Sequence, residues 1–184
     1  MTAPQIVGTV IDALNQLGIP YMLVGSFSSN FYGTPRSTKD ADFVCQIDHE
    51  VLNPLASLLG TDFELDRQMS FETITATMRY RLHHKASAFM IGLFELSSDP
   101  HDQMRFSRRV ETQFAGHKAF VPMPEDVIIT KLRWSKHGQR AKDVEDVRNV
   151  LTIQSGKLDL PYIRHWCDQH ATRDLFERLL LAVS

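Results

Sequence analysis

Two carboxylates, Asp40 and Asp42, form the pattern in this sequence that points most directly to chemistry. They stand two residues apart at the start of a segment that reads as a strand, so both side chains are expected on one face of a sheet. Two carboxylates in that arrangement can converge on one divalent cation or on a close pair of cations. Because magnesium takes hard oxygen ligands and completes its shell with water and phosphate oxygens, the pair is typical of a magnesium–phosphate site.

A candidate phosphate-binding turn precedes these carboxylates. The apolar run Tyr21–Val24 has the length of a buried strand, and Gly25 and Ser26 follow it directly. Gly25 lets the backbone approach a phosphate closely, and Ser26, expected to cap a short helix, offers a hydroxyl beside backbone N–H donors. Either feature alone is common in ordinary turns. Their combination with two carboxylates, separated from Ser26 by thirteen residues, is more specific.

Three more side chains are candidates for contacts with a triphosphate. Arg36 and Thr38 lie in the polar loop before the carboxylates, and Lys131 lies in a later helix. The alternatives are that the first two only hold the turn and that the lysine is solvated or ion-paired.

A basic cluster surrounds Lys131 in the sequence and could bind RNA or a nucleotide tail, although basic residues near helix ends usually serve solubility. Asp143 and Asp146, three residues apart on one helix, are expected to pair with its later members or to contact a substrate. The cluster comprises Lys131, Arg133, Lys136, His137, Arg140 and Lys142.

Composition limits the class of protein. The 184 residues are 43% hydrophobic and carry a formal net charge of −2, which favours one globular domain and excludes wholesale disorder. A net charge of this sign does not favour non-specific binding to the phosphate backbone of nucleic acid. Two distant cysteines provide neither a disulfide framework nor a zinc spacing. No apolar run is long enough for a bilayer and the first residues lack a signal-peptide pattern, so we expect a cytoplasmic protein without a membrane partner.

Periodicity predicts an α+β fold, with a mixed sheet and flanking helices over residues 1–122 and a helical segment over 123–184 packed on that core. The first part should contain helices near 4–17, 26–32 and 51–59, strands at 21–24, 40–47, 74–82 and 88–96, and a hairpin of 109–114 with 118–121. Four helices should follow, at 124–136, around 144–151, and at 160–170 and 172–183.

The Val24–Ser26 and Asp40–Asp42 pattern resembles the nucleotidyltransferase superfamily with the fold of DNA polymerase β. Phe31–Asp42 and Pro124–Trp134 are similar to a branch of small bacterial proteins that includes the AbiEii-type toxins. The resemblance implies a nucleotidyltransferase-type sheet on which Asp40 and Asp42 hold two divalent ions, Mg²⁺ in this family. It also implies that Gly25 and Ser26 bind the triphosphate of ATP or GTP, and that a nucleotidyl group passes to a hydroxyl of RNA or of a partner protein.

The chain departs from this family at a third carboxylate, which the family places on a neighbouring strand. Gly92, within the run 88–94, stands where an aspartate is expected. Glu95 has the wrong strand parity to replace it unless a β-bulge intervenes, and Glu72 and Asp99 are further alternatives. Two functions therefore stay open. One is nucleotidyl transfer, and the other is a catalytically degenerate binding protein, for example in a toxin–antitoxin or phage-defence system.

Overall fold

The computed structural model describes residues 1–138 and 141–183, which divide into two units. The first, here the sheet unit, comprises Met1–Val24 and Thr38–Val121. The second, here the helical unit, comprises Gly25–Ser37 and the described residues from Pro122 onward. The helical unit therefore includes a segment from the first quarter of the chain, in addition to the C-terminal helical segment expected over residues 123–184.

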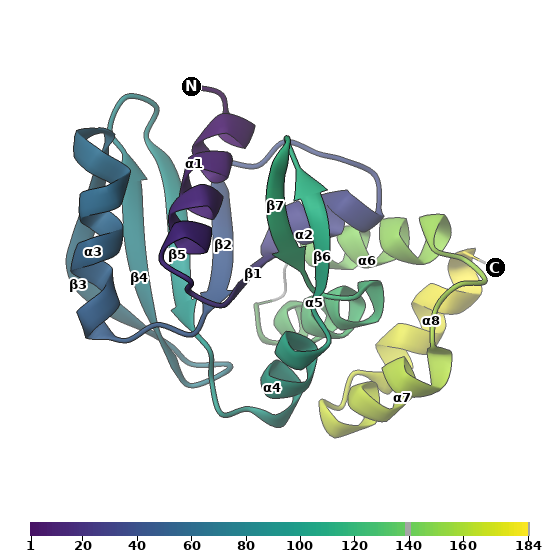
Figure 1. The fold of residues 1–184 in the computed structure, drawn as a ribbon. Helices are drawn as coiled ribbons and strands as arrows, with labels where there is room; N and C mark the ends of the chain where they lie inside the picture. Colours follow the sequence, from purple (N-terminus) through teal and green to yellow (C-terminus); the bar gives the residue numbers. More distant parts are fainter. Residues whose placement is uncertain (139–140, 184) are drawn as a thin grey trace. The chain divides into compact units, whose positions relative to one another are not determined.

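A five-stranded mixed sheet forms the centre of the sheet unit (Figure 1). Its strands are arranged in the order β1-β2-β5-β4-β3, with β2 and β5 parallel and the other neighbours antiparallel. This confirms the expected α+β class with a mixed sheet. The strands are β1 (Tyr21–Val24), β2 (Asp40–Cys45), β3 (Phe63–Glu72), β4 (Thr77–His84) and β5 (Phe89–Glu95).

Helices α1 (Ala3–Gln16) and α3 (His49–Leu59) cover one face of this sheet (Figure 1). The apolar stripe of α1 is fully buried, and Asp48 caps α3 by accepting the N–H groups of Glu50 and Val51. On β2, Ala41 and Phe43 are buried, whereas Asp40 is exposed and Asp42 half-buried. The alternation of the strand therefore places both carboxylates on the face opposite these helices.

The remaining elements of the sheet unit are η1 (Gly60–Asp62), α4 (Pro100–Ser107) and the hairpin of β6 (Val110–Phe114) with β7 (His117–Val121). The hairpin was predicted, whereas β3 and α4 were not. Strand β3 was missed because its sequence is mostly polar, so it shows no clear alternation of apolar and polar residues. Helix α4 carries a readable signal, since Asp99 caps its N-terminus and Pro100 occupies the first turn.

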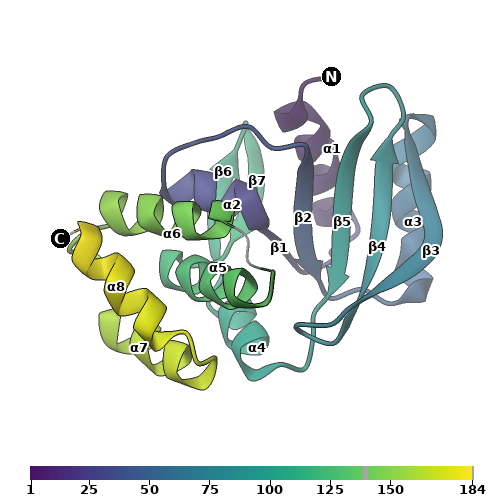
Figure 2. The same ribbon diagram turned by 180° about the vertical axis from the view of Figure 1, so that it is seen from behind.

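Five helices make up the described part of the helical unit (Figure 2). Their core consists of aliphatic side chains with Phe176 and Cys167, and its members come from the four helices that follow Pro122. No helix in residues 1–138 or 141–183 has both the length and the apolar character needed to cross a membrane. The helices are α2 (Gly25–Tyr32), α5 (Pro124–Gly138), α6 (Ala141–Ile153), α7 (Leu160–Gln169) and α8 (Arg173–Val183).

Candidate functional site

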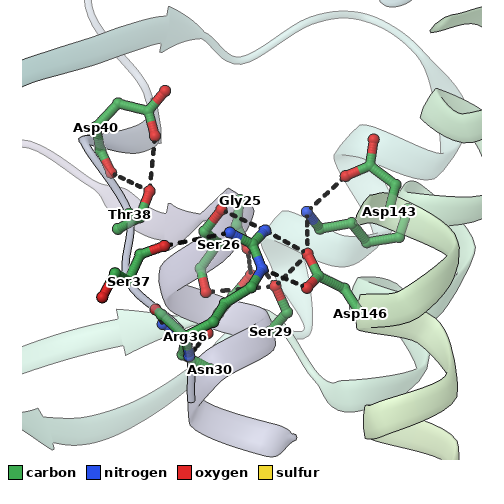
Figure 3. Close-up of polar contacts among 12 residues, drawn as sticks. Gly25, Ser26, Ser29, Asn30, Arg36, Ser37, Thr38, Asp40, Asp143 and Asp146 are labelled. Atoms are coloured by element: carbon green, nitrogen blue, oxygen red, sulfur yellow. Dashed lines mark hydrogen bonds and ion pairs between the residues drawn. The ribbon is translucent and has the colours of Figure 1, made fainter. Parts of the chain in front are cut away.

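The two candidate metal ligands lie in the sheet unit and have different partners. Asp40 accepts a hydrogen bond of 2.8 Å from the hydroxyl of Thr38, which also donates to the Asp40 carbonyl at 3.1 Å (Figure 3). Asp42 forms an ion pair in which Nη2 of Arg79 lies 3.2 Å from Oδ1. Sequence reasoning missed Arg79. The structure thus gives Thr38 a role in orienting Asp40, where the sequence predicted a phosphate contact.

Gly92 lies beside Asp42, because the parallel register of β2 and β5 pairs the two residues. This confirms that the position expected to carry a third carboxylate is on the strand next to β2. The φ of Gly92 is outside the left-handed region, so its backbone does not demand glycine. A Cβ at this position would lie 2.6 Å from Oδ1 of Asp42 and 2.9 Å from both Nε and Nη2 of Arg79. The space above Gly92 is therefore filled by the ion pair.

The alternative third carboxylates have other roles. Glu95 accepts from the hydroxyl of Tyr80 at 2.8 Å, Glu72 accepts from the backbone N–H of Ile74 and Thr75, and Asp99 caps α4. In the described ranges, no group of three His, Cys, Asp or Glu side chains could hold a metal ion. Two carboxylates fit one Mg²⁺ whose shell is completed by phosphate and water. The donor set for a second ion does not fit, since Oδ1 of Asp42 is paired with Arg79 and the neighbouring Gly92 supplies no carboxylate.

The other candidates lie in the helical unit, in a set of polar residues that we call the Asp146 cluster (Figure 3). Arg36 makes a two-point ion pair with Asp146, with Nε and Nη2 each 2.8 Å from a carboxylate oxygen, and its Nη2 also donates to Oγ of Ser26 at 3.0 Å. Nζ of Lys131 lies 2.9 Å from Asp143 and 2.8 Å from Asp146. The cluster comprises Ser26, Ser29, Arg36, Lys131, Asp143 and Asp146.

The Asp146 carboxylate is the centre of this cluster and is almost fully buried. Burial opposes its charge, but hydrogen bonds from Arg36 and Lys131 outweigh burial, and the pKa of Asp146 is lowered. Lys131 is only 8% exposed. The two cations expected to bind a triphosphate are thus paired with carboxylates, so a phosphate at Ser26 would compete with Asp146 for the same donors.

Two polar side chains of α2 hold the cluster in place, and sequence reasoning missed both. The side chain of Asn30 forms two hydrogen bonds with the backbone of Arg36: it accepts from the N–H at 3.1 Å and donates to the carbonyl at 2.7 Å. Ser29 donates to Oδ2 of Asp146 at 3.3 Å. The expectation that Ser26 caps α2 is wrong, because the helix begins at Gly25, whose φ is +64°, and Ser26 lies in its first turn.

The basic cluster predicted around Lys131 does not form one surface that includes this lysine. Lys131 is buried, whereas Lys142 is exposed and Lys136 donates to the carbonyl of His170 at 3.2 Å. Arg140, one of the expected partners of the α6 carboxylates, lies outside the described residues. In the structure Asp143 and Asp146 bind Lys131 from the preceding helix, and Asp146 also binds Arg36.

Comparison with known proteins identifies the fold. No protein-family model and no curated protein matches the chain. An antigenic nucleotidyltransferase-like protein from Paracoccidioides brasiliensis is 17% identical with a TM-score of 0.60, over 97% of this chain and 92% of its own. The structure of ANT(2'')-Ia in complex with adenylyl-2''-tobramycin is 12% identical with a TM-score of 0.64, over 95% of this chain and 99% of its own. The chain therefore has the fold of nucleotidyltransferase-like proteins.

Proposed function

We propose that this protein binds a nucleoside triphosphate with Mg²⁺ through Asp40 and Asp42 and transfers the nucleotidyl group to a hydroxyl acceptor on RNA or a partner protein, with release of pyrophosphate. The observation that carries the proposal is the position of both carboxylates on one face of β2, away from α1 and α3, in a chain with this fold. The adenylyl-2''-tobramycin named in the ANT(2'')-Ia structure makes ATP the first donor to test.

The carboxylates serve the proposed reaction by binding and orientation. When bound, Mg²⁺ would neutralise phosphate charge, which is the main requirement of nucleotidyl transfer besides alignment of the reacting groups. Asp40 is already oriented by Thr38 through a 2.8 Å hydrogen bond. Contributions of Gly25, Ser26, Arg36 and Lys131 to triphosphate binding stay predictions, because the last two are engaged in the Asp146 cluster.

A second function is favoured by the pairing of Asp42 with Arg79 over Gly92. A protein without the third carboxylate and with one metal ligand already in an ion pair fits nucleotide binding without transfer. Such a protein would act as a binding or interaction module, for instance in a toxin–antitoxin or phage-defence pair.

Calorimetric titration with ATP and GTP, with and without Mg²⁺, tests the proposal. We expect Mg²⁺-dependent binding that Asp42→Asn weakens by about tenfold or more, because a ligand charge is lost. Glu64→Gln is the matched control, since it removes a charge from an exposed carboxylate of β3 in the same unit. Absence of binding by the wild type to either nucleotide in Mg²⁺ contradicts the proposal.

A second measurement separates the two functions. Incubation with ATP or GTP labelled at the α-phosphate, together with cellular RNA or protein, should transfer label to an acceptor in the wild type and not in Asp42→Asn. Binding of nucleotide without any transfer of label identifies the binding protein instead.

A further inference from the structure

Arg79 reaches Asp42 across an intervening strand. It belongs to β4 and pairs in register with Phe94 of β5, while Asp42 belongs to β2 and pairs with Gly92 of β5. Strands β4 and β2 are second neighbours in the sheet, about 10 Å apart from backbone to backbone. The side chain spans this distance by passing over Gly92, the residue of β5 that has no side chain to obstruct it.

We infer that Arg79 is a built-in cation of this site, whose guanidinium takes the place of one divalent ion at Asp42. The inference rests on the proposed function, because it concerns how many ions accompany the nucleotide there. Two carboxylates and one guanidinium give Asp40, Asp42 and Arg79 together a formal charge of −1. One Mg²⁺ brings the sum of these charges to +1 and a second would bring it to +3, so the arginine disfavours a second ion more strongly than the first.

Two contacts hold the guanidinium of Arg79 beside the Asp42 carboxylate. Its Cζ is 4.8 Å from the centre of the Phe94 ring, which is a cation–π contact. Its Nη2 lies 3.2 Å from Oδ1 of Asp42, and the side chains of both residues are only about a quarter exposed. The buried Nε has no hydrogen-bond partner in the described part of the chain. The ring and the carboxylate therefore hold the guanidinium.

Gly92 is then the residue that permits this arrangement. Any Cβ at this position would fall 2.9 Å from the guanidinium and 2.6 Å from the carboxylate oxygen, closer than side chains normally approach. A carboxylate at position 92 and the present position of Arg79 are thus mutually exclusive. The guanidinium of Arg79 therefore occupies space that a side chain at position 92 would need.

A titration with Mn²⁺ alone tests the inference without nucleotide. Binding is measured as the loss of the free-ion signal in electron paramagnetic resonance. Arg79→Ala should bind Mn²⁺ about tenfold more tightly than the wild type, because a positive charge next to the ligand oxygen is removed. Arg79→Lys keeps the charge and should stay near the wild type. Arg81→Ala is the matched control, since Arg81 lies two residues along β4 on the same face and pairs in register with Gly92.

The inference is overturned if Arg79→Ala binds Mn²⁺ no more tightly than the wild type, or if Arg81→Ala tightens binding equally. Either result would mean that the guanidinium does not hold a specific cation position. Failure of the proposed function is seen separately, as absence of Mg²⁺-dependent nucleotide binding by the wild type, and it does not alter the comparison made with Mn²⁺ alone.

The number of bound ions gives a second, independent readout. Gly92→Asp alone should gain no second Mn²⁺, because Arg79 can pair with the new carboxylate. Gly92→Asp combined with Arg79→Ala should bind two ions. Two ions bound by Gly92→Asp alone would contradict the inference, and if the glycine variants do not fold, the comparison of Arg79→Ala with Arg81→Ala still decides it.

Discussion

Arg36 and Asp146 are 110 residues apart in the sequence and meet through two hydrogen bonds of 2.8 Å between one guanidinium and one carboxylate. Asp146 also binds Lys131 at 2.8 Å and accepts from the hydroxyl of Ser29 at 3.3 Å. Because a buried charge is stable only when it is paired, these contacts join the segment Gly25–Ser37 to α5 and α6 inside the helical unit. The Asp146 cluster is thus a structural element, whatever further role its cations have.

Asp146→Asn should destabilise the protein by about 3 kcal/mol, since it leaves Arg36 and Lys131 with one carboxylate fewer in a buried setting. The free energy of unfolding in urea measures this loss. Glu145→Gln is the control on the same helix, because Glu145 forms an exposed pair with Arg148 at 3.4 Å and should change stability by less than about 1 kcal/mol. Equal losses in the two variants would show that the cluster does not stabilise the fold.

Acid should weaken the contribution of Asp146. Its pKa in the folded protein is below the ordinary value of 3.8, so its contribution is fully present above that value and is lost as the pH falls through the lowered pKa. The difference in unfolding free energy between wild type and Asp146→Asn should be constant near neutral pH and shrink below about pH 4. A difference that stays unchanged down to about pH 2 would contradict the lowered pKa.

Gly92→Ala should cost at most about 1 kcal/mol, because the added methyl group meets only the ends of the Arg79 and Asp42 side chains, which have to move aside. In the Arg79→Ala background the same change should cost less, since the contacts to the guanidinium at 2.9 Å are then absent. A double-mutant cycle measured by urea unfolding gives the coupling. Additive costs for the two substitutions would mean that the two positions do not interact.

Both thiols should be unreactive in the native protein. Cys45 and Cys167 have no exposed surface, and burial raises the pKa of each thiol. Because the thiolate is the reactive form, a disulfide reagent at about pH 8 should react slowly with folded protein and rapidly in urea. Rapid reaction of one thiol under native conditions would instead reveal local opening of its unit, the sheet unit for Cys45 and the helical unit for Cys167.

Local pattern was sufficient for much of the fold and for part of the candidate site. The apolar spacing of α1 and of the helices after Pro122 predicted elements that the structure contains, because one buried helical face leaves a periodic trace in sequence. The period of two in a strand likewise predicted that Asp40 and Asp42 share a face. That Gly92 lies on the neighbouring strand was implied by the family resemblance, and the register of β2 with β5 confirms it. Strand β3 was not predicted, because its many polar residues leave no clear two-residue alternation in the sequence.

The sequence by itself determined which chemical groups are present, the parity of the strand that carries the carboxylates, and the lack of an acid at Gly92. Only the tertiary structure decided which groups meet. Arg79 is paired with Asp42 because the register of three strands brings them together over a glycine, and Lys131 and Arg36 are paired with Asp146 because two distant segments pack in one unit. A sequence with 20 basic and 22 acidic side chains allows many such pairings, and the choice among them depends on non-local packing that no local period encodes.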